Sequence, residues 1–133
     1  MATIAKFDVL TTLGATRRTT AADGPETFSG AAVDLAPYVN PGGRQLKALL
    51  NIGAITSTGH LNVKLQANST TAEAGFADIT GATFTETADS ASLTGSEAIH
   101  FRTNARYVRA IATVQHTGNF DFGVYVVAER KLV

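Results

Sequence analysis

Apolar and polar residues alternate with a period of two along most of this chain. In the clearest case, Leu61, Val63 and Leu65 alternate with polar residues up to Asn68. This alternation is typical of a β-strand with one face in a core and the other in solvent. The pattern predicts strands at residues 28–35, 45–51, 61–68, 76–79, 82–87, 98–103, 106–115 and 120–127.

Short segments rich in glycine, asparagine and serine separate these strands, and such residues favour turns. They lie at residues 40–43, 57–59, 81, 94–96 and 117–119. Many short strands with regular turns are typical of a sandwich or a barrel. The chain is therefore predicted to be all-β, an antiparallel β-sandwich of jelly-roll-like form. A Greek-key or immunoglobulin-like sandwich is the alternative.

Residues 1–27 differ from the rest because they are rich in threonine and poor in apolar residues. Ile4, Phe7 and Val9 are exceptions that allow either a first strand or an extended N-terminal arm. We therefore divide the chain into an arm or first strand, residues 1–27, and a β-sandwich domain, residues 28–133. An arm would lie along the edge of a neighbouring subunit or form a mobile terminus.

The last two predicted strands allow a statement on register. Their apolar faces consist of Val108, Ala110, Ala112 and Val114 on the first strand and Phe120, Phe122, Val124 and Val126 on the second. A hairpin with a three-residue loop, residues 117–119, would place Val114 opposite Phe122 and join these faces in the core. Gly118 and Asn119 both tolerate the positive φ that such a loop requires.

The other face of that hairpin would combine aromatic, aliphatic and arginine side chains, a mixture enriched in protein interfaces. The chain's own N-terminal segment or the second sheet would cover this face, or another protein would bind there. Two adjacent arginines in the N-terminal segment are further candidates for contact with an acidic patch of a partner. The candidate interface residues are Arg17, Arg18, Tyr107, Arg109, Ile111, Tyr125 and Val127.

Composition narrows the class of protein. The 133 residues suffice for one domain, and 11 basic against 11 acidic residues give no net charge. A nucleic-acid partner is therefore not expected, since such binders carry a basic excess. Charged residues are only 17% of the chain, which indicates that much of its surface lies against a partner. No signal peptide and no apolar run of about 20 residues is present. We therefore expect that the protein is made in the cytoplasm and does not associate with a membrane.

Motifs for catalysis are missing from the sequence. The three histidines, His60, His100 and His116, lack partners at metal-site spacing, and there is no cysteine. Neither a nucleophile elbow nor a phosphate-binding glycine loop occurs. We therefore expect no enzyme, no cofactor and no metal. A carbohydrate-binding module remains an alternative, although the chain has three tyrosines and no tryptophan with which to stack sugars.

Several segments carry a resemblance to a known family. They are Val33-Asp34-Leu35, Val63-Lys64-Leu65-Gln66-Ala67-Asn68, Gly75-Phe76-Ala77-Asp78-Ile79, Arg106-Tyr107-Val108-Arg109-Ala110-Ile111 and Ala128-Glu129-Arg130-Lys131. Over residues 28–131 the chain resembles the small virion proteins of tailed bacteriophages. Within these it is most similar to the jelly-roll cement, or decoration, proteins such as the Bordetella-phage cementing protein.

This resemblance implies a structural protein on the exterior of a virion, made in the cytoplasm of a bacterial host. It would bind the major capsid protein, bridge capsid subunits and stabilise the mature shell, and it would form a homodimer or homotrimer. A tail or head-fibre component is the alternative. The resemblance conflicts with the hairpin on one point, because a strict jelly roll places most consecutive strands in opposite sheets.

Overall fold

Strands account for most of this computed structural model, which describes residues 6–20, 25–39, 44–56, 60–85, 95–115 and 118–131. The strands are β1 (Phe7–Thr20), β2 (Glu26–Ser29), β3 (Val33–Asp34), β4 (Arg44–Thr56), β5 (His60–Asn68), β6 (Ala77–Thr83), β7 (Gly95–Thr103), β8 (Tyr107–Gln115) and β9 (Gly118–Glu129). A short 3-10 helix, η1 (Glu73–Gly75), precedes β6. Within the described part of the chain, no helix is long and apolar enough to cross a membrane.

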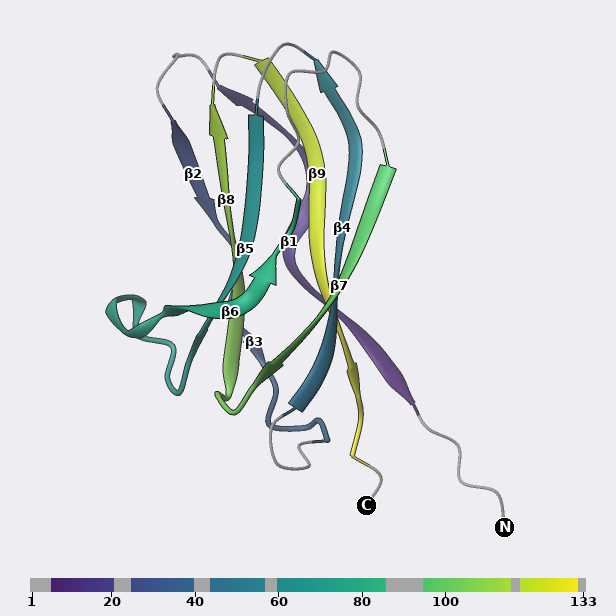
Figure 1. Cartoon of the computed structure of the whole chain (residues 1–133), viewed down its shortest axis with the longest axis vertical. Helices are drawn as coiled ribbons and strands as arrows, with labels where there is room; N and C mark the ends of the chain where they lie inside the picture. Colours follow the sequence, from purple (N-terminus) through teal and green to yellow (C-terminus); the bar gives the residue numbers. More distant parts are fainter. Residues whose placement is uncertain are drawn as a thin grey trace.

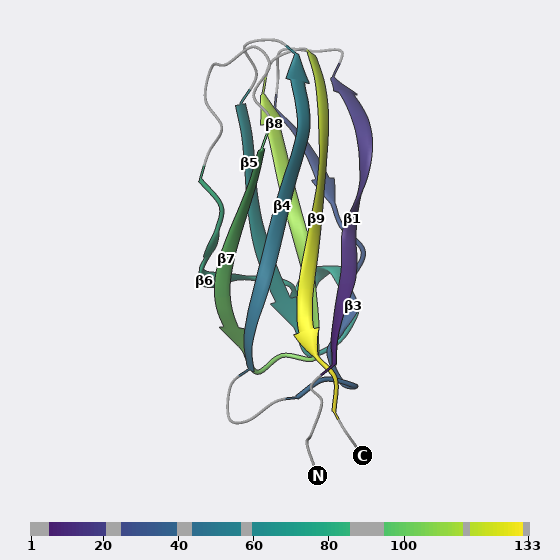
Figure 2. The ribbon, with the colours of Figure 1, turned by 90° about the vertical axis from the view of Figure 1, so that its right-hand side faces the viewer.

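Two antiparallel sheets pack face to face and confirm the predicted sandwich (Figure 1). Sheet A has the order β1-β9-β4-β7 and is seen face-on in Figure 2. Sheet B has the order β2-β8-β5-β6, and the short β3 also pairs with β8. Most consecutive strands lie in opposite sheets, which is the connectivity of a jelly roll.

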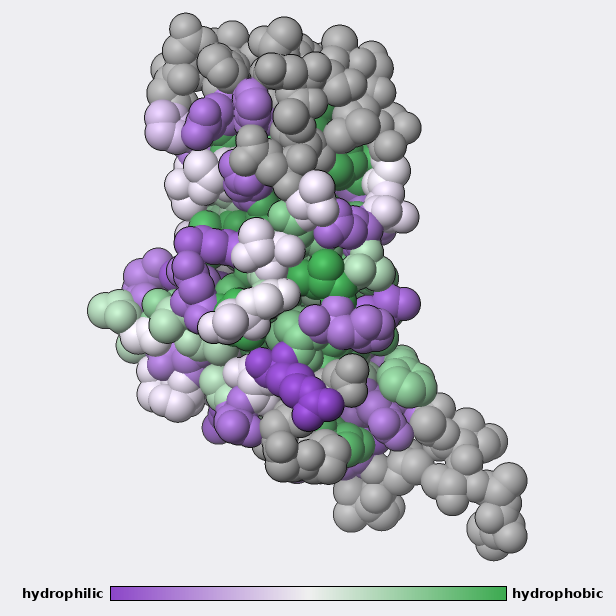
Figure 3. Space-filling model, in the orientation of Figure 1, coloured by the Kyte–Doolittle hydropathy of each residue, from purple (hydrophilic) through white to green (hydrophobic). Residues whose placement is uncertain are grey.

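The predicted inward faces are confirmed. The core contains Leu46, Ala48, Leu50, Leu61, Val63, Leu65, Val108, Ala110, Ala112, Val114, Phe120, Phe122, Val124 and Val126, each with at most 3% of its surface exposed. On the side of the molecule seen in Figure 3, which looks onto β6 and β7, apolar atoms show between hydrophilic side chains.

The predicted hairpin of the last two strands is wrong. Strand β8 lies in sheet B between β2 and β5, whereas β9 lies in sheet A between β1 and β4. Alternation predicted correctly which side chains point inward, but it contains no information on which strands are neighbours in a sheet. Residue 117, the first of the predicted loop, lies outside the described residues, and Gly118 and Asn119 belong to β9.

Two predicted strand boundaries also differ from the structure. The segment 28–35 is not continuous, because the chain leaves β8 between Ser29 and Val33. The turn predicted at Gly81 is instead an irregularity within β6, where Gly81 has a φ of +80° that favours glycine. The end of the strand predicted at 82–87 and the turns predicted at 40–43 and 57–59 lie outside the described residues.

Candidate protein interface

The predicted interface residues do not share one face. Tyr107, Arg109 and Ile111 lie on the outer face of sheet B, because they alternate with the buried residues of β8. Tyr125 and Val127 lie on the outer face of sheet A, where they alternate with the buried residues of β9. This part of the prediction fails together with the hairpin on which it rested.

Arg109 is covered by the chain's own segment before β6. The residue is 7% exposed, and its guanidinium group lies 4.2 Å from the centre of the Phe76 ring. The guanidinium donates hydrogen bonds of 3.1 and 2.9 Å to Gln66 and forms an ion pair with Glu73. The hydrogen bond from Arg109 holds the pKa of Glu73 below its usual range. Arg109 therefore fastens η1 onto sheet B and leaves little surface for a partner.

The rest of the outer face of sheet B is polar and internally paired. Ile111 is 8% exposed and lies between Ser29 on β2 and Lys64 on β5. The Lys64 ammonium group contacts the Asp78 carboxylate at 2.9 Å, and Tyr107 is half-buried beneath the Arg106 guanidinium group at 5.1 Å. Charges on this face have partners within the chain, so the face offers few unsatisfied groups to another protein.

Arg18 lies at the open edge between the two sheets. Its guanidinium group lies 4.4 Å from the Phe122 ring of sheet A and 5.8 Å from the Phe28 ring of sheet B. It donates to the carbonyl oxygens of Phe122 at 2.7 Å and Gly14 at 2.9 Å. Burial lowers the pKa of this guanidinium. The backbone of Arg17 pairs with Asp121, and its side chain lies outside what the structure describes.

The outer face of sheet A, in contrast, carries exposed apolar side chains. Val127 pairs with Val9 on β1, and Tyr125 pairs with Leu49 on β4. Phe7 and Val9 are each 62% exposed and are the large apolar residues with the most exposure among those described. We call Phe7, Val9, Leu49, Tyr125 and Val127 the apolar strip. It extends over three adjacent strands of sheet A.

Tyr125 lies flat against sheet A. A Cβ atom placed on Gly123 would lie 2.6 Å from the Tyr125 hydroxyl and 3.1 Å from the Cα atom of Ala15. Glycine at position 123 is therefore what lets the tyrosine ring cover the sheet and lets β1 approach β9. The ring stays half-buried, with an aromatic surface at the centre of this face.

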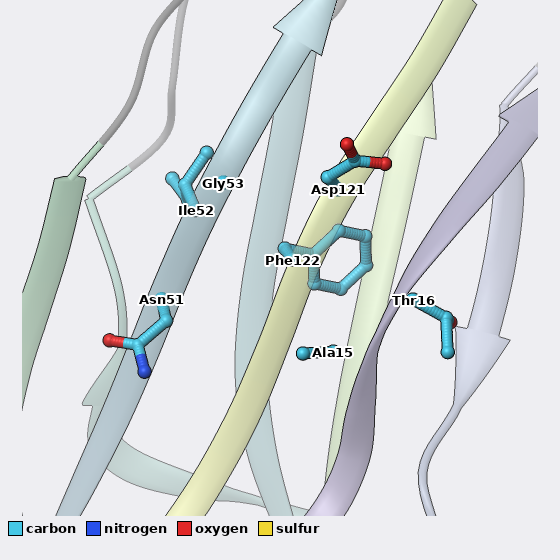
Figure 4. A pocket seen from close by; sticks show the side chains of 7 residues that line it. All are labelled: Ala15, Thr16, Asn51, Ile52, Gly53, Asp121 and Phe122. Carbon is cyan, nitrogen blue, oxygen red and sulfur yellow. The ribbon is translucent and has the colours of Figure 1, made fainter.

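A hollow of about 460 Å³ lies beside the strip, near the other end of sheet A. Irregularities in β1, after Thr11, and in β4, after Ile52, accompany it, because both strands shift register there against β9. Its polar residues come from three neighbouring strands: Thr16 on β1, Asp121 on β9 and Asn51 on β4 (Figure 4). The complete lining is Ala15, Thr16, Asn51, Ile52, Gly53, Asp121 and Phe122.

Sequence reasoning found Tyr125 and Val127 but did not join them to Phe7, Val9 and Leu49. The signal was present, since Phe7 and Val9 flank the polar Asp8 in a period of two. What the sequence did not show is that β1 pairs with the C-terminal strand. No cluster of three metal-ligating side chains occurs among the residues that the structure describes.

Comparison with known proteins supports the fold. No protein-family model and no curated protein sequence matches the chain. A chain in the structure of infectious bursal disease virus, Gx strain, superposes with a TM-score of 0.59 and 5% identity, covering 95% of this chain and 32% of the viral chain. This chain thus spans about a third of the viral one, and at such low identity the likeness concerns the fold alone.

A chain in the cryo-EM structure of broad bean stain virus gives a TM-score of 0.45 and 10% identity, with 100% of this chain and 93% of the viral chain covered. A chain from the Gt strain of infectious bursal disease virus gives 0.44 and 11%, with 97% and 38% covered. The superposition on the Gx-strain chain shows that this β-sandwich is similar in fold to a chain found in a virus structure.

Proposed function

We propose that this protein is a structural component of a virion, a cement protein on the outside of a bacteriophage capsid. It would bridge subunits of the major capsid protein, stabilise the mature shell and be present as a homodimer or homotrimer. The observation that carries this proposal is the apolar strip on the outer face of sheet A. The jelly-roll fold supports it, because viral capsid domains are among the common uses of this fold.

The two outer faces differ in a way that favours sheet A as the docking surface. Sheet B presents ion pairs such as Lys64–Asp78 and a buried Arg109, so a partner would have to break contacts that already exist. Sheet A presents Phe7 and Val9 with most of their surface in water. Burying such surface is favourable by roughly 25 cal/mol per Å². Apolar and aromatic anchors of this kind dominate the energy of protein interfaces.

Stabilisation of a shell needs binding and no chemistry. A protein that binds the assembled shell better than its separated subunits stabilises the shell by mass action. Each copy that straddles two subunits adds contacts that must break before the subunits separate.

The first experiment asks whether the protein is a shell component. Particles from the source lysate are separated on a density gradient, and each fraction is analysed by quantitative mass spectrometry. Co-migration with the major capsid protein at a fixed, high copy ratio supports the cement function. A few copies per particle would assign the protein to a tail or head fibre, and absence from particles would overturn the virion assignment.

A second experiment tests the docking surface. Purified variants are added to particles that lack the protein, and occupancy is measured after sedimentation. Val127→Asp places a charge in the apolar strip and should reduce occupancy at least tenfold. Thr113→Asp is the matched control, a half-buried strand residue on the outer face of sheet B, and should bind normally. Equal loss in both variants, or in neither, would contradict the assignment to sheet A.

The hollow beside the strip favours one alternative, a carbohydrate-binding module. Asn51 and Asp121 supply an amide and a carboxylate, groups that bind sugar hydroxyls, and lectins also use the jelly roll. A glycan array with the purified protein tests this function. Binding that Asp121→Ala abolishes, from a protein absent from particles, would replace the cement assignment.

A further inference from the structure

Within the part of the chain that the structure describes, no strand pairs with the outer side of the N-terminal half of β1, which forms an edge of sheet A. The Arg130 N–H donates to the Lys6 carbonyl at 2.7 Å, so these two residues form a hydrogen-bonded pair at the start of the ladder with β9. In an antiparallel ladder such pairs alternate with pairs that exchange no hydrogen bond. Even-numbered residues here bond to β9, and the backbone groups of residues 7, 9 and 11 point away from it. We call residues 7–11 the free edge.

The free edge ends at Thr12. The Thr12 carbonyl accepts a 2.7 Å hydrogen bond from the Ala31 N–H, so the chain between β2 and β3 contacts the backbone of β1 at this point. Among the described residues, no backbone hydrogen bond reaches the outer side of residues 7–11. In Figure 1 this half of β1 runs away from β3, and in Figure 2 β1 lies at the border of sheet A.

The other edges of the sandwich carry features that discourage pairing with another chain. Natural proteins protect edge strands by shortness, irregularity or charge. Strand β2 has only four residues, and β6 is irregular at Gly81. Strand β7 carries Glu97, His100 and Arg102. The free edge, with the sequence Phe-Asp-Val-Leu-Thr, has none of these features apart from one acidic residue.

That acidic residue, Asp8, is already neutralised within its own chain. Its carboxylate accepts a 2.9 Å hydrogen bond from the Tyr38 hydroxyl and lies 3.0 Å from the Arg130 guanidinium. The hydrogen bond from Tyr38 holds the pKa of Asp8 below its usual range. Two copies of the edge can therefore meet without bringing two unpaired carboxylates together.

We propose that the free edge pairs antiparallel with the free edge of a second copy of this chain, about a twofold axis at Val9. Val9 is the midpoint of residues 7–11, so this register uses every outward backbone group. Phe7 of each copy then lies opposite Thr11 of the other. About six backbone hydrogen bonds form, because the residues that point away from β9 are the ones that face the second copy.

The pairing also brings together the most exposed apolar side chains. Phe7 and Val9 of both copies would lie on one face of a continuous sheet, next to Val127, and the two apolar strips would become one surface. A twofold contact of this kind is isologous and closes at two copies, so it does not extend into a fibre. This inference deepens the homo-oligomer part of the proposed function, and it rests on the backbone edge rather than on binding to a shell.

The oligomeric state of the purified full chain tests the pairing, by light scattering after gel filtration and by sedimentation equilibrium. We expect a dimer. Val9→Pro removes an N–H that points away from β9, so it should leave the chain's own ladder intact and weaken the dimer at least tenfold. Val9→Thr keeps that N–H and is the matched control that stays dimeric. Far-UV circular dichroism and thermal unfolding confirm that both variants fold.

Cysteine cross-linking tests the register, since the native chain has no cysteine. In a hydrogen-bonded pair the two Val9 Cα atoms lie about 5.5 Å apart, within reach of a disulfide. Val9→Cys should therefore form a covalent dimer on mild oxidation. Thr11→Cys should not, because its two copies lie about 14 Å apart, yet it should cross-link to Phe7→Cys when the two variants are mixed.

Each other result overturns the pairing. A monomer at all concentrations, a trimer, a dimer unaffected by Val9→Pro, or self-cross-linking of Thr11→Cys would each do so. A monomer that pairs only with a strand of another virion protein is also an overturning result. Failure to bind particles, with the dimer intact, would refute the proposed function and leave this inference standing.

Discussion

Thr12 is the residue at which the two sheets are tied together, and Thr12→Val tests this directly. The Thr12 side chain is 4% exposed. Its hydroxyl donates to the Ala31 carbonyl at 2.9 Å and accepts from the Ala110 N–H at 2.9 Å. The segment between β2 and β3 leaves the β8 ladder near Ala110. The Thr12 hydroxyl therefore accepts the hydrogen bond from the Ala110 N–H that a neighbouring strand would otherwise accept. Valine has nearly the same shape, so the substitution removes these bonds without opening a large cavity.

The loss of stability expected for Thr12→Val depends on whether the groups that the hydroxyl contacts can find other hydrogen-bond partners. Ala31 is exposed, so water can replace the hydroxyl at its carbonyl. Ala110 is fully buried, so its N–H is left without a partner, at a cost of about 1–3 kcal/mol. Thr12→Ser is the control, because it keeps both hydrogen bonds and loses one methyl group, worth about 1 kcal/mol or less.

Urea unfolding measures the difference. The valine variant should unfold at a urea concentration lower by roughly 1 M, with an unchanged slope, and the serine variant by clearly less. If the valine variant is as stable as the serine variant, the hydroxyl does not link the sheets.

Substitutions at three further positions have defined outcomes. Gly30→Ala should cost about 1–3 kcal/mol in urea unfolding, because the added Cβ would lie 2.3 Å from the Thr12 hydroxyl oxygen and 2.7 Å from its carbonyl oxygen; full stability would contradict this close approach. Arg109→Ala should cost roughly 2–3 kcal/mol while leaving particle occupancy unchanged in the folded fraction, and Arg109→Lys should recover part of that stability; lost occupancy with normal stability would return Arg109 to the interface. Glu73→Gln should flatten the decline of the melting temperature in acid: the pKa of Glu73 is lowered in the folded chain, so its contribution is present above about pH 4.5 and lost as the pH falls through the folded value. A variant with the acid profile of the native chain would show that this carboxylate contributes nothing.

The sequence was sufficient for the class of fold and for the inward faces of most strands. Val108 to Val114 and Phe120 to Val126 alternate because each strand has one side against the core, and this requirement acts on every strand separately. The order of the strands within each sheet, in contrast, depends on the packing of the whole sandwich. The hairpin between β8 and β9 satisfied the local pattern as well as the jelly roll does, so the pattern was unable to choose between them.

The candidate site was predicted in part for the same reason. Tyr125 and Val127 were identified as outward residues, and the structure leaves them on an open face. Arg109 was also identified as outward, yet Glu73, 36 residues away in sequence, and Phe76 cover it. No periodicity in either segment indicates that contact. Alternation along a strand therefore shows which side of the sheet a residue occupies. Whether that residue is accessible depends on segments distant in sequence that pack over the sheet.

Thr12 divides β1 into two parts with different roles, and this division connects the two proposals. Thr12 is hydrogen-bonded to Ala31 and Ala110, and Arg18 further along contacts the Phe28 ring of β2. Residues 7–11, in contrast, keep one side of the backbone for pairing and one face of side chains for the apolar strip. Val9 contributes to both, through its N–H in the first case and its side chain in the second, so proline and threonine at this position separate the two contributions. Paired copies would present two strips on one continuous sheet, and two linked contacts bind far more tightly than either alone. Under the proposed function, a strip of five apolar side chains on an otherwise polar face would then suffice for durable binding to a shell whose own sites repeat in space.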